Sequence, residues 1–204
     1  MERKSEEAIN TELIKMVLYR KYRPKNFAEV VGQEHVVETL QGAIQTGRLA
    51  HAYLFTGPRG TGKTSLARLL AKAVNCDRAG GQTDACAVCD SCKEVEEGRA
   101  MDLIEIDAAS NRGIDDIRAL REGTRFSSMN SGKYKVYVID ECHQLSKDAS
   151  NALLKTLEEP PAKTIFILAT TEPHKVLPTI VSRVQKFDFK KLNTDQIIFK
   201  LDRI

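Results

Sequence analysis

The stretch GPRGTGKT at residues 57–64 fits the phosphate-binding pattern GxxxxGK[ST] at every position. Residues 52–55 before it form a short apolar run typical of a buried strand, and residues 65–74 after it carry apolar side chains at helical spacing. This order of strand, glycine-rich loop and helix is the context that the motif requires, which makes a chance glycine-rich turn the weaker interpretation. The stretch therefore predicts a binding site for a nucleoside triphosphate.

Each residue type in this glycine loop has a chemical reason. The glycines let the backbone point several amide hydrogens at a triphosphate, next to the positive end of the following helix. Lys63 supplies a mobile cation for the outer phosphates, and Thr64 offers a hydroxyl to the magnesium ion that bridges them. The nucleotide-binding residues expected here are Gly57, Pro58, Arg59, Gly60, Thr61, Gly62, Lys63, Thr64 and Ser65.

The composition limits the class of protein. With 204 residues, 42% of them apolar, the chain can bury a core, and a net charge of +3 is too balanced for a nucleic-acid polycation, so any contact with DNA must be local. No apolar run approaches the roughly 20 residues of a membrane helix, and the charged residues 1–7 predict no signal peptide. We expect a cytoplasmic protein, in which clustered cysteines indicate metal or redox chemistry.

Strands and helices are predicted to alternate along the chain. The predicted strands cover residues 52–55, 103–106, 135–139, 164–169 and 185–189, and the later helices cover residues 114–126, 146–158 and a short helix from Pro178. Such alternation is typical of a parallel sheet covered on both faces, in which ligands bind beyond the carboxyl ends of the strands. The glycine loop, Asp107, Asp140 and Thr170 all fall at those ends.

The apolar strand at residues 135–139 delivers two adjacent carboxylates, Asp140 and Glu141. Asp140 can hold a water molecule of the magnesium ion, and Glu141 can accept a proton from an attacking water. A pair of surface acids is the plainer alternative, but it leaves unexplained why an apolar strand ends in them beside a phosphate-binding loop. A hydroxyl from Thr170 or Thr171, at the end of the next strand, can orient the water or sense the outer phosphate; the alternative is an ordinary polar strand end.

Four cysteines gather between the helix after the glycine loop and the next strand, at Cys76, Cys86, Cys89 and Cys92. Four thiolates suit a closed tetrahedral zinc site, and the CxxC spacings point neighbouring sulfurs at one ion. The residues between them include few apolar side chains, so the segment needs such a staple. Disulfides and an iron–sulfur cluster are the alternatives. Cys142 stands apart and is expected to be a core thiol.

Taken together, these residues closely resemble the gamma/tau subunit family of the bacterial DNA polymerase III clamp loader, whose ATPase part is an AAA+ domain. The matching stretches are LYRKYRP (18–24), VVGQ (30–33), HAYLFTGPRGTGKT (51–64), the four-cysteine insert, IEIDAASN (104–111), YVIDECHQLSKDASNALLKTLEEPP (137–161), LATTEPHK (168–175) and TIVSR (179–183). The resemblance implies an α/β fold: an AAA+ P-loop NTPase domain with a central five-stranded parallel sheet flanked by helices and a small four-cysteine zinc insert.

The resemblance also implies domain boundaries. The ATPase domain is expected at residues 18–192 with the zinc insert at 76–92, after an N-terminal helix or tail at 1–17. Residues 193–204 are expected to start a helical lid domain, of which too little remains to form the whole. The chain thus resembles an excised ATPase domain.

Roles for individual residues follow from the resemblance as well. Glu141 is implied to be the general base, and Thr170 or Thr171 the first sensor, of which we choose Thr171. Arg183 is implied to be an arginine finger for the ATP site of a neighbouring subunit, although alone it would equally suit a surface arginine. Contacts on the adenine side are implied for Tyr19, Arg20, Arg23, Pro24, Val31 and Gly32.

The implied activity is ATP hydrolysis by a clamp-loader motor subunit, which places the beta sliding clamp on primed DNA in a ring with delta and delta-prime type subunits. ATP, Mg²⁺ and Zn²⁺ are the implied ligands, and Asn111 and Arg112 resemble the region that touches the DNA backbone. Two alternatives remain open here. One is a zinc-stapled, nucleotide-responsive binding module with little turnover. The other is a small-molecule P-loop kinase, which would gain nothing from an Asp-Glu pair and a trans arginine.

Overall fold

The computed structural model describes residues 21–78, 83–111, 113–124 and 132–202. In these ranges the strands are β1 (Ala52–Thr56), β2 (Leu103–Asp107), β3 (Lys135–Asp140), β4 (Thr164–Thr170) and β5 (Gln185–Asp188). They form a five-stranded sheet in the order β2-β3-β4-β1-β5, and all neighbouring strands run parallel. The predicted central parallel sheet is confirmed, and the predicted strand ends are correct to within one residue.

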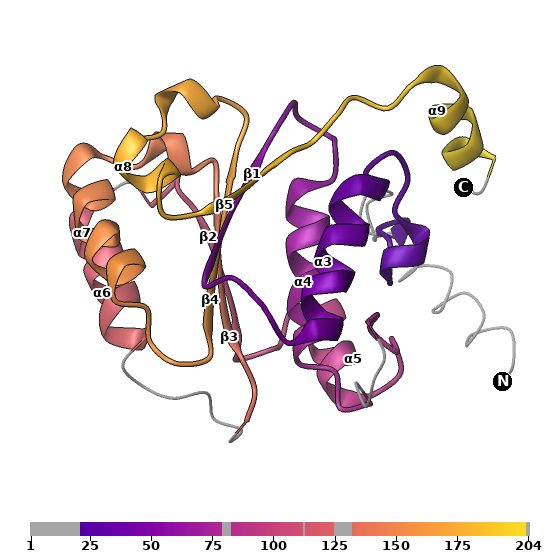
Figure 1. Ribbon diagram of the computed structural model, residues 1–204, viewed down its shortest axis with the longest axis horizontal. Helices are drawn as coiled ribbons and strands as arrows, with labels where there is room; N and C mark the ends of the chain where they lie inside the picture. Colours follow the sequence, from indigo (N-terminus) through magenta and orange to yellow (C-terminus); the bar gives the residue numbers. More distant parts are fainter. Residues whose placement is uncertain (1–20, 79–82, 112, 125–131, 203–204) are drawn as a thin grey trace, which may run out of the picture.

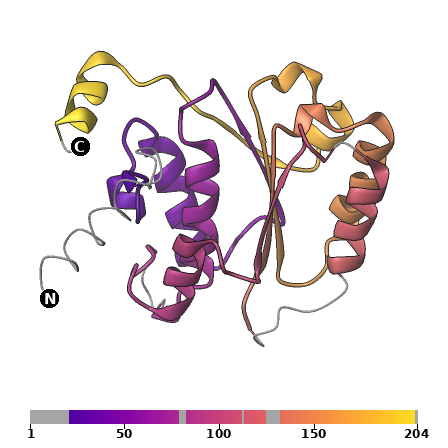
Figure 2. The same ribbon diagram turned by 180° about the vertical axis from the view of Figure 1, so that it is seen from behind.

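Helices cover both faces of the sheet (Figure 1, and from behind in Figure 2). One face carries α3 (Glu34–Thr46), α4 (Lys63–Val74) and α5 (Asp90–Glu97), and the other carries α6 (Ile114–Thr124), α7 (Lys147–Glu158) and α8 (Pro178–Val181). Short 3-10 turns lie at Phe27–Glu29, Cys142–Gln144 and Pro173–Lys175. The last helix, α9 (Thr194–Leu201), lies on the same side as α3 and α4.

Two apolar cores, one on each face of the sheet, explain this layering. Tyr53 and Phe55 of β1 pack into the core below α3 and α4, whereas Leu54 packs into the core below α6 and α7. Because successive side chains of a strand point to opposite faces, a strand covered on both sides is expected to be apolar along most of its length. All residues of β1 and β4 are accordingly buried.

The strand order brings three chain segments to one edge of the sheet. Strand β4 pairs with β1 on one side and with β3 on the other. The glycine loop follows β1, Asp140 ends β3 and Thr170 ends β4, so all three lie at the carboxyl edge. In parallel sheets this edge is where ligands bind, at the point where the strand order reverses.

The helix ends follow the local sequence. Ser146 precedes α7 and its hydroxyl accepts a hydrogen bond from the Ala149 amide at 3.1 Å, as expected of an N-cap. Helix α5, however, begins at Asp90 inside the cysteine segment, where we predicted no helix. It is eight residues long and buries only Ser91, Cys92 and Val95, which is too short an apolar pattern to recognise by periodicity.

The predicted N-terminal helix or tail at residues 1–17 lies outside the described residues. Among the helices in the described ranges, none is both long enough and apolar enough to cross a membrane.

Candidate functional site

The glycine loop wraps the N-terminus of α4. Gly57, Gly60 and Gly62 have φ angles of +146°, +76° and +95°, which residues with side chains rarely adopt. A Cβ atom at Gly57 would also lie 2.5 Å from the carbonyl oxygen of Phe189, so this position admits no side chain. Gly62 precedes the first residue of α4, and the amide groups of the loop therefore adjoin the positive end of that helix.

Lys63, the first residue of α4, is buried with 6% of its surface exposed. Its Nζ atom donates hydrogen bonds to the carbonyl oxygens of Gly57 and Pro58, both at 2.8 Å. Burial lowers the pKa of Lys63, and the nearby charges of Glu141 and Asp140 oppose that shift. The ammonium group of Lys63 is thus held by carbonyls of the loop itself.

Thr64 and Asp140, the two predicted magnesium ligands, are neighbours. The Thr64 hydroxyl donates a hydrogen bond to Oδ2 of Asp140 at 2.7 Å, although the two residues come from α4 and β3. A hydroxyl and a carboxylate are hard oxygen donors, which Mg²⁺ prefers together with phosphate and water oxygens. The donor set therefore fits this ion.

Glu141 follows directly and has φ +47° and ψ +44°, a left-handed conformation. For a residue with a long side chain this conformation costs on the order of 1 kcal/mol. It carries the carboxylate toward β4, where Oε2 accepts hydrogen bonds from the hydroxyl of Thr171 at 3.0 Å and from its amide at 3.3 Å. The other oxygen, Oε1, lies 3.7 Å from Nε of Arg59 in the glycine loop.

His143 completes this cluster, and the sequence analysis did not single it out. Only 5% of its side chain is exposed; its Nδ1 lies 2.9 Å from the Thr170 hydroxyl and 3.4 Å from Glu141 Oε2. Its Nε2 lies 3.0 Å from a carboxylate oxygen of Glu172. Nε2 also lies 3.1 Å from the side-chain amide nitrogen of Gln144, and the Thr170 hydroxyl oxygen accepts a hydrogen bond from the Glu172 amide at 3.0 Å. Through its two ring nitrogens, His143 thus joins the turn after β3 to the end of β4.

The signal for His143 was present in the sequence, because a histidine two residues after a strand-end acid pair lies near the same sheet edge.

The two predicted sensor candidates have separate contacts. Thr171 holds Glu141, whereas Thr170 is fully buried and joins His143.

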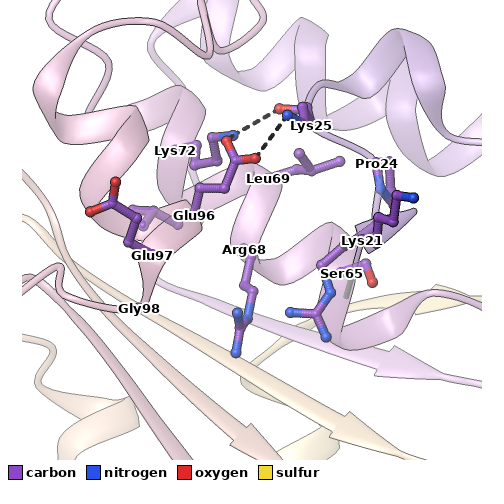
Figure 3. Close-up of a pocket in the computed structure, with 12 residues that line it drawn as sticks. Lys21, Pro24, Lys25, Ser65, Arg68, Leu69, Lys72, Glu96, Glu97 and Gly98 are labelled. Carbon is purple, nitrogen blue, oxygen red and sulfur yellow. Dashed lines mark hydrogen bonds and ion pairs between the residues drawn. The ribbon is translucent and has the colours of Figure 1, made fainter. Parts of the chain in front are cut away.

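A cavity of about 180 Å³ adjoins the glycine loop on the side of α9. It is lined by Pro24, Glu29, Val30, Val31, Gln33, Gly60, Thr61, Gly62, Ser65, Leu66, Phe189, Leu192 and Lys200. Of the residues predicted on the adenine side, Pro24 and Val31 line it, and Gly32 has a φ of +80°, where a Cβ would lie 2.2 Å from a methyl carbon of Leu192. Arg23 lines a neighbouring cavity of about 360 Å³, drawn in Figure 3. Tyr19 and Arg20 lie outside the described residues.

Arg183 follows α8, which covers the opposite face of the sheet from α4 (Figure 1). Its guanidinium donates to the Thr179 carbonyl oxygen at 2.8 Å and forms an ion pair with Glu158 at 2.8 Å. The hydrogen bonds and ion pair of this arginine are thus with α7, α8 and Ser182, and the structure does not bring it to the glycine loop of the same chain.

The turn after β2 contains Asn111, whose side-chain amide donates to the Asp107 carbonyl oxygen at 3.1 Å. The Asp107 carboxylate accepts hydrogen bonds from the Ala109 amide and the Ser110 hydroxyl, so this acid shapes the turn. Arg112, the other residue predicted to face DNA, lies outside the described residues.

The four predicted zinc ligands converge. The sulfur atoms of Cys76, Cys86, Cys89 and Cys92 all lie within 4.8 Å of one another, and those of Cys76 and Cys89 are 3.9 Å apart. Sulfurs bound at about 2.3 Å around a tetrahedral zinc ion lie about 3.8 Å from one another, so the geometry fits the ion. Backbone amides of Val88 and Cys89 lower the pKa of Cys86 to about 6, which favours its thiolate, whereas burial raises the pKa of Cys76 and of Cys92.

Cys142 is 6% exposed in the core below α7, as expected of a core thiol, and burial raises its pKa to about 12.

We expect the purified protein to contain about one zinc ion per chain, with sulfur ligands only, because four thiols at tetrahedral spacing leave no open position. Elemental analysis and X-ray absorption at the zinc edge measure both quantities. Cys92→Ser should lower the zinc content, while the control Cys142→Ala should keep it. Metal-free protein with disulfides between these cysteines would contradict the assignment.

Comparison with known proteins gives the family. The family model described as "DNA polymerase III, delta subunit" matches residues 32–193. The chain is 54% identical over 187 residues to DNA polymerase III subunit tau of Bacillus subtilis, covering 92% of this chain and 33% of the relative. It is 53% identical over 188 residues to subunit tau of Escherichia coli K12, with 92% and 29% covered. Subunit gamma/tau of Mycobacterium tuberculosis H37Rv is 51% identical over 179 residues, with 87% and 31% covered. The chain thus spans about a third of the length of these relatives.

Solved structures show the same fold. A DNA polymerase III gamma subunit-related protein of Thermotoga maritima is 27% identical with a TM-score of 0.53, over 78% of this chain and 47% of that one. The Holliday junction branch migration motor RuvB of Thermotoga maritima is 20% identical with a TM-score of 0.65, over 89% and 53%. At that identity the second likeness shows the AAA+ P-loop fold alone. By its match to the family model, the chain belongs to the DNA polymerase III subunit family, in which tau and gamma/tau subunits are its relatives.

Proposed function

We propose that this chain is the ATP-binding and ATP-hydrolysing domain of a clamp-loader motor subunit. The observation that carries the proposal is the meeting of Lys63, Thr64, Asp140, Glu141 and Thr171 at one edge of the sheet, where Thr64 bonds Asp140 and Thr171 bonds Glu141. A phosphate-binding cation, a pair of magnesium ligands and a general base held by a hydroxyl are what phosphoryl transfer to water requires.

Each residue has a distinct task in this proposal. The loop amides and Lys63 bind the phosphates, and the Lys63 ammonium exchanges the carbonyls of Gly57 and Pro58 for phosphate oxygens. Thr64 and Asp140 would hold Mg²⁺, which would supply positive charge next to the phosphates. Glu141 accepts the proton of the attacking water; Thr171 fixes one carboxylate oxygen, so that the other faces the glycine loop.

Arg183 acts on the ATP site of a neighbouring subunit. Its position beside α7 and α8 supports this role, because its guanidinium is held by Glu158 and Thr179 rather than by any group of its own glycine loop. A planar cation presented at a subunit surface suits the spread negative charge of a phosphoryl-transfer transition state.

The whole-protein role is loading of the beta sliding clamp onto primed DNA during replication, in a ring with delta and delta-prime type subunits in the cytoplasm. The names of the relatives support a place in DNA polymerase III. We assign residues 18–192 to the ATPase domain, 76–92 to its zinc insert and 193–204 to the start of a helical lid. The lid assignment is supported by α9, whose Ile198 and Leu201 are 51% and 60% exposed.

A second candidate is a nucleotide-responsive, zinc-stapled binding module with little turnover. One observation favours it: Lys63 and Glu141 are both hydrogen-bonded within the protein, to the glycine loop and to Thr171. ATP hydrolysis would then require a partner whose binding releases Lys63 and Glu141 from these hydrogen bonds.

Glu141→Gln should keep its affinity for ATP and lose about 10²- to 10⁴-fold in turnover, because the amide cannot accept the proton of water. Equilibrium binding of ATP and steady-state phosphate release measure the two quantities. The control is Glu159→Gln, which changes an exposed acid after α7 and should leave both unchanged. Equal turnover of Glu141→Gln and the wild type would remove Glu141 from the mechanism.

Specific ATPase activity should rise with the concentration of the chain, because each completed site needs Arg183 from a second copy. Arg183→Ala should abolish that rise. Lys155→Ala, which removes another exposed charge from α7, is the control and should retain it. Activity that stays near zero at every concentration in the wild type would favour the binding module over the motor.

A further inference from the structure

The cysteine module, defined as residues 76–78 and 83–98, packs against a segment far from it in sequence. That segment, residues 24–33, contains five of the residues that line the cavity of about 180 Å³ next to the glycine loop. We call it the base-side segment. The cysteine module and the base-side segment are joined by hydrogen bonds and ion pairs, not by apolar packing alone.

Asp84 makes the most direct connection. Its carboxylate accepts the Phe27 amide with both oxygens, each at 2.9 Å, and the Ala28 amide at 3.4 Å. The same carboxylate accepts the amide of Ala85 in its own module at 2.8 Å. A charged acceptor shared by amides of two segments is a strong tie, and Phe27 itself is 1% exposed in the core.

A second tie runs through α4 and α5 (Figure 3). Glu96 of α5 pairs with Nζ of Lys25 at 3.1 Å and with Nζ of Lys72 at 3.7 Å. Lys72, only 4% exposed, also donates to the carbonyl oxygen of Lys25 at 3.0 Å. Lys25 is thus held at its backbone and at its side chain.

The cavity of about 360 Å³ drawn in Figure 3 is the seam between these elements. Three of the cations that line it form ion pairs: Lys25 and Lys72 with Glu96, and Arg68 with Glu105 of β2. The nearby acid Glu97 pairs with Arg99. The ion pairs in this seam therefore connect α5 to Lys25 and to α4, and α4 to β2.

The held positions lie between cavity-lining positions. In the module, Asp84 holds the amides of Phe27 and Ala28, and Glu96 pairs with the side chain of Lys25. Pro24 on one side and residues 29–31 on the other line the nucleotide-side cavity. Because only a few residues separate them, a shift of the held backbone moves the wall of the cavity.

The module is also fixed to the sheet, so it can act as a rigid support. Asp77 pairs with Lys133 at 2.9 Å, just before β3, and accepts a hydrogen bond from the Ser91 hydroxyl at 3.2 Å. At the end of α4, the Asn75 side chain exchanges two hydrogen bonds of 2.7 Å with the backbone of Tyr134.

We propose that Asp84 is a positioning residue for nucleotide binding: through it, with Glu96 as a second tie, the cysteine module sets the base-side wall of the ATP site. This inference rests on the proposed nucleotide binding. It assigns the module to recognition of the nucleoside, while the glycine loop binds the phosphates independently. If the module only stabilised the fold, its loss would weaken the binding of the nucleoside and of the phosphates alike.

The experiment compares two ligands, ADP and inorganic triphosphate, with the wild type and Asp84→Ala. Isothermal titration gives both affinities, and elemental analysis gives the zinc content. Asp84→Ala should bind ADP about tenfold more weakly, the loss expected when a charged acceptor is removed. Its affinity for inorganic triphosphate and its zinc content should stay unchanged, because neither the glycine loop nor the cysteines contact Asp84 by side-chain bonds.

Asp90→Ala is the matched control, since it removes an exposed acid of the same module that has no tie to the base-side segment. Glu96→Gln is the second variant, usable if Asp84→Ala does not fold; it should weaken ADP binding in the same direction by a smaller factor. Unchanged ADP affinity in Asp84→Ala or, if that variant does not fold, in Glu96→Gln, or equal losses for both ligands, would overturn the proposal. A wild type that binds neither ligand would instead refute the proposed function.

Discussion

The pairing of β4 with both β1 and β3 is the constraint on which the site depends. Thr56 of β1 lies opposite Thr170 of β4, and Ile139 of β3 opposite Leu168. This register puts the ends of three strands side by side, although they are separated by long crossover connections. A slip of one residue would turn every side chain of a strand to the other face, so two buried cores fix the positions of the glycine loop, Asp140 and Thr171.

Several polar groups of the site are buried or strained, and the surrounding fold holds them in place. Lys63 is buried, Glu141 adopts a left-handed backbone, and His143 lies nearly enclosed among Glu141, Thr170 and Glu172. Strained or desolvated groups of this kind gather where a protein does chemistry. The hydrogen bonds from Thr171 and Thr64 keep both carboxylates of the pair in defined positions before any ligand arrives.

Local signals predicted much of this structure, whereas long-range contacts could not be read from the sequence. The glycine loop, the strand that ends in Asp140 and the cap at Ser146 each depend on neighbours in the chain. Asp84 had no such signal, because its partners are the amides of Phe27 and Ala28, which lie 57 and 56 positions earlier in the chain. Only the folded arrangement brings the cysteine module against the base-side segment.

Equilibrium binding of MgATP to the wild type and to Lys63→Ala tests the central claim most directly. If the glycine loop is the phosphate site, the wild type binds and Lys63→Ala binds roughly 10- to 100-fold more weakly, the range expected for losing a charged hydrogen-bond donor. Lys155→Ala serves as the control and should match the wild type. Equal binding by the wild type and Lys63→Ala, or no binding by either, would contradict the account.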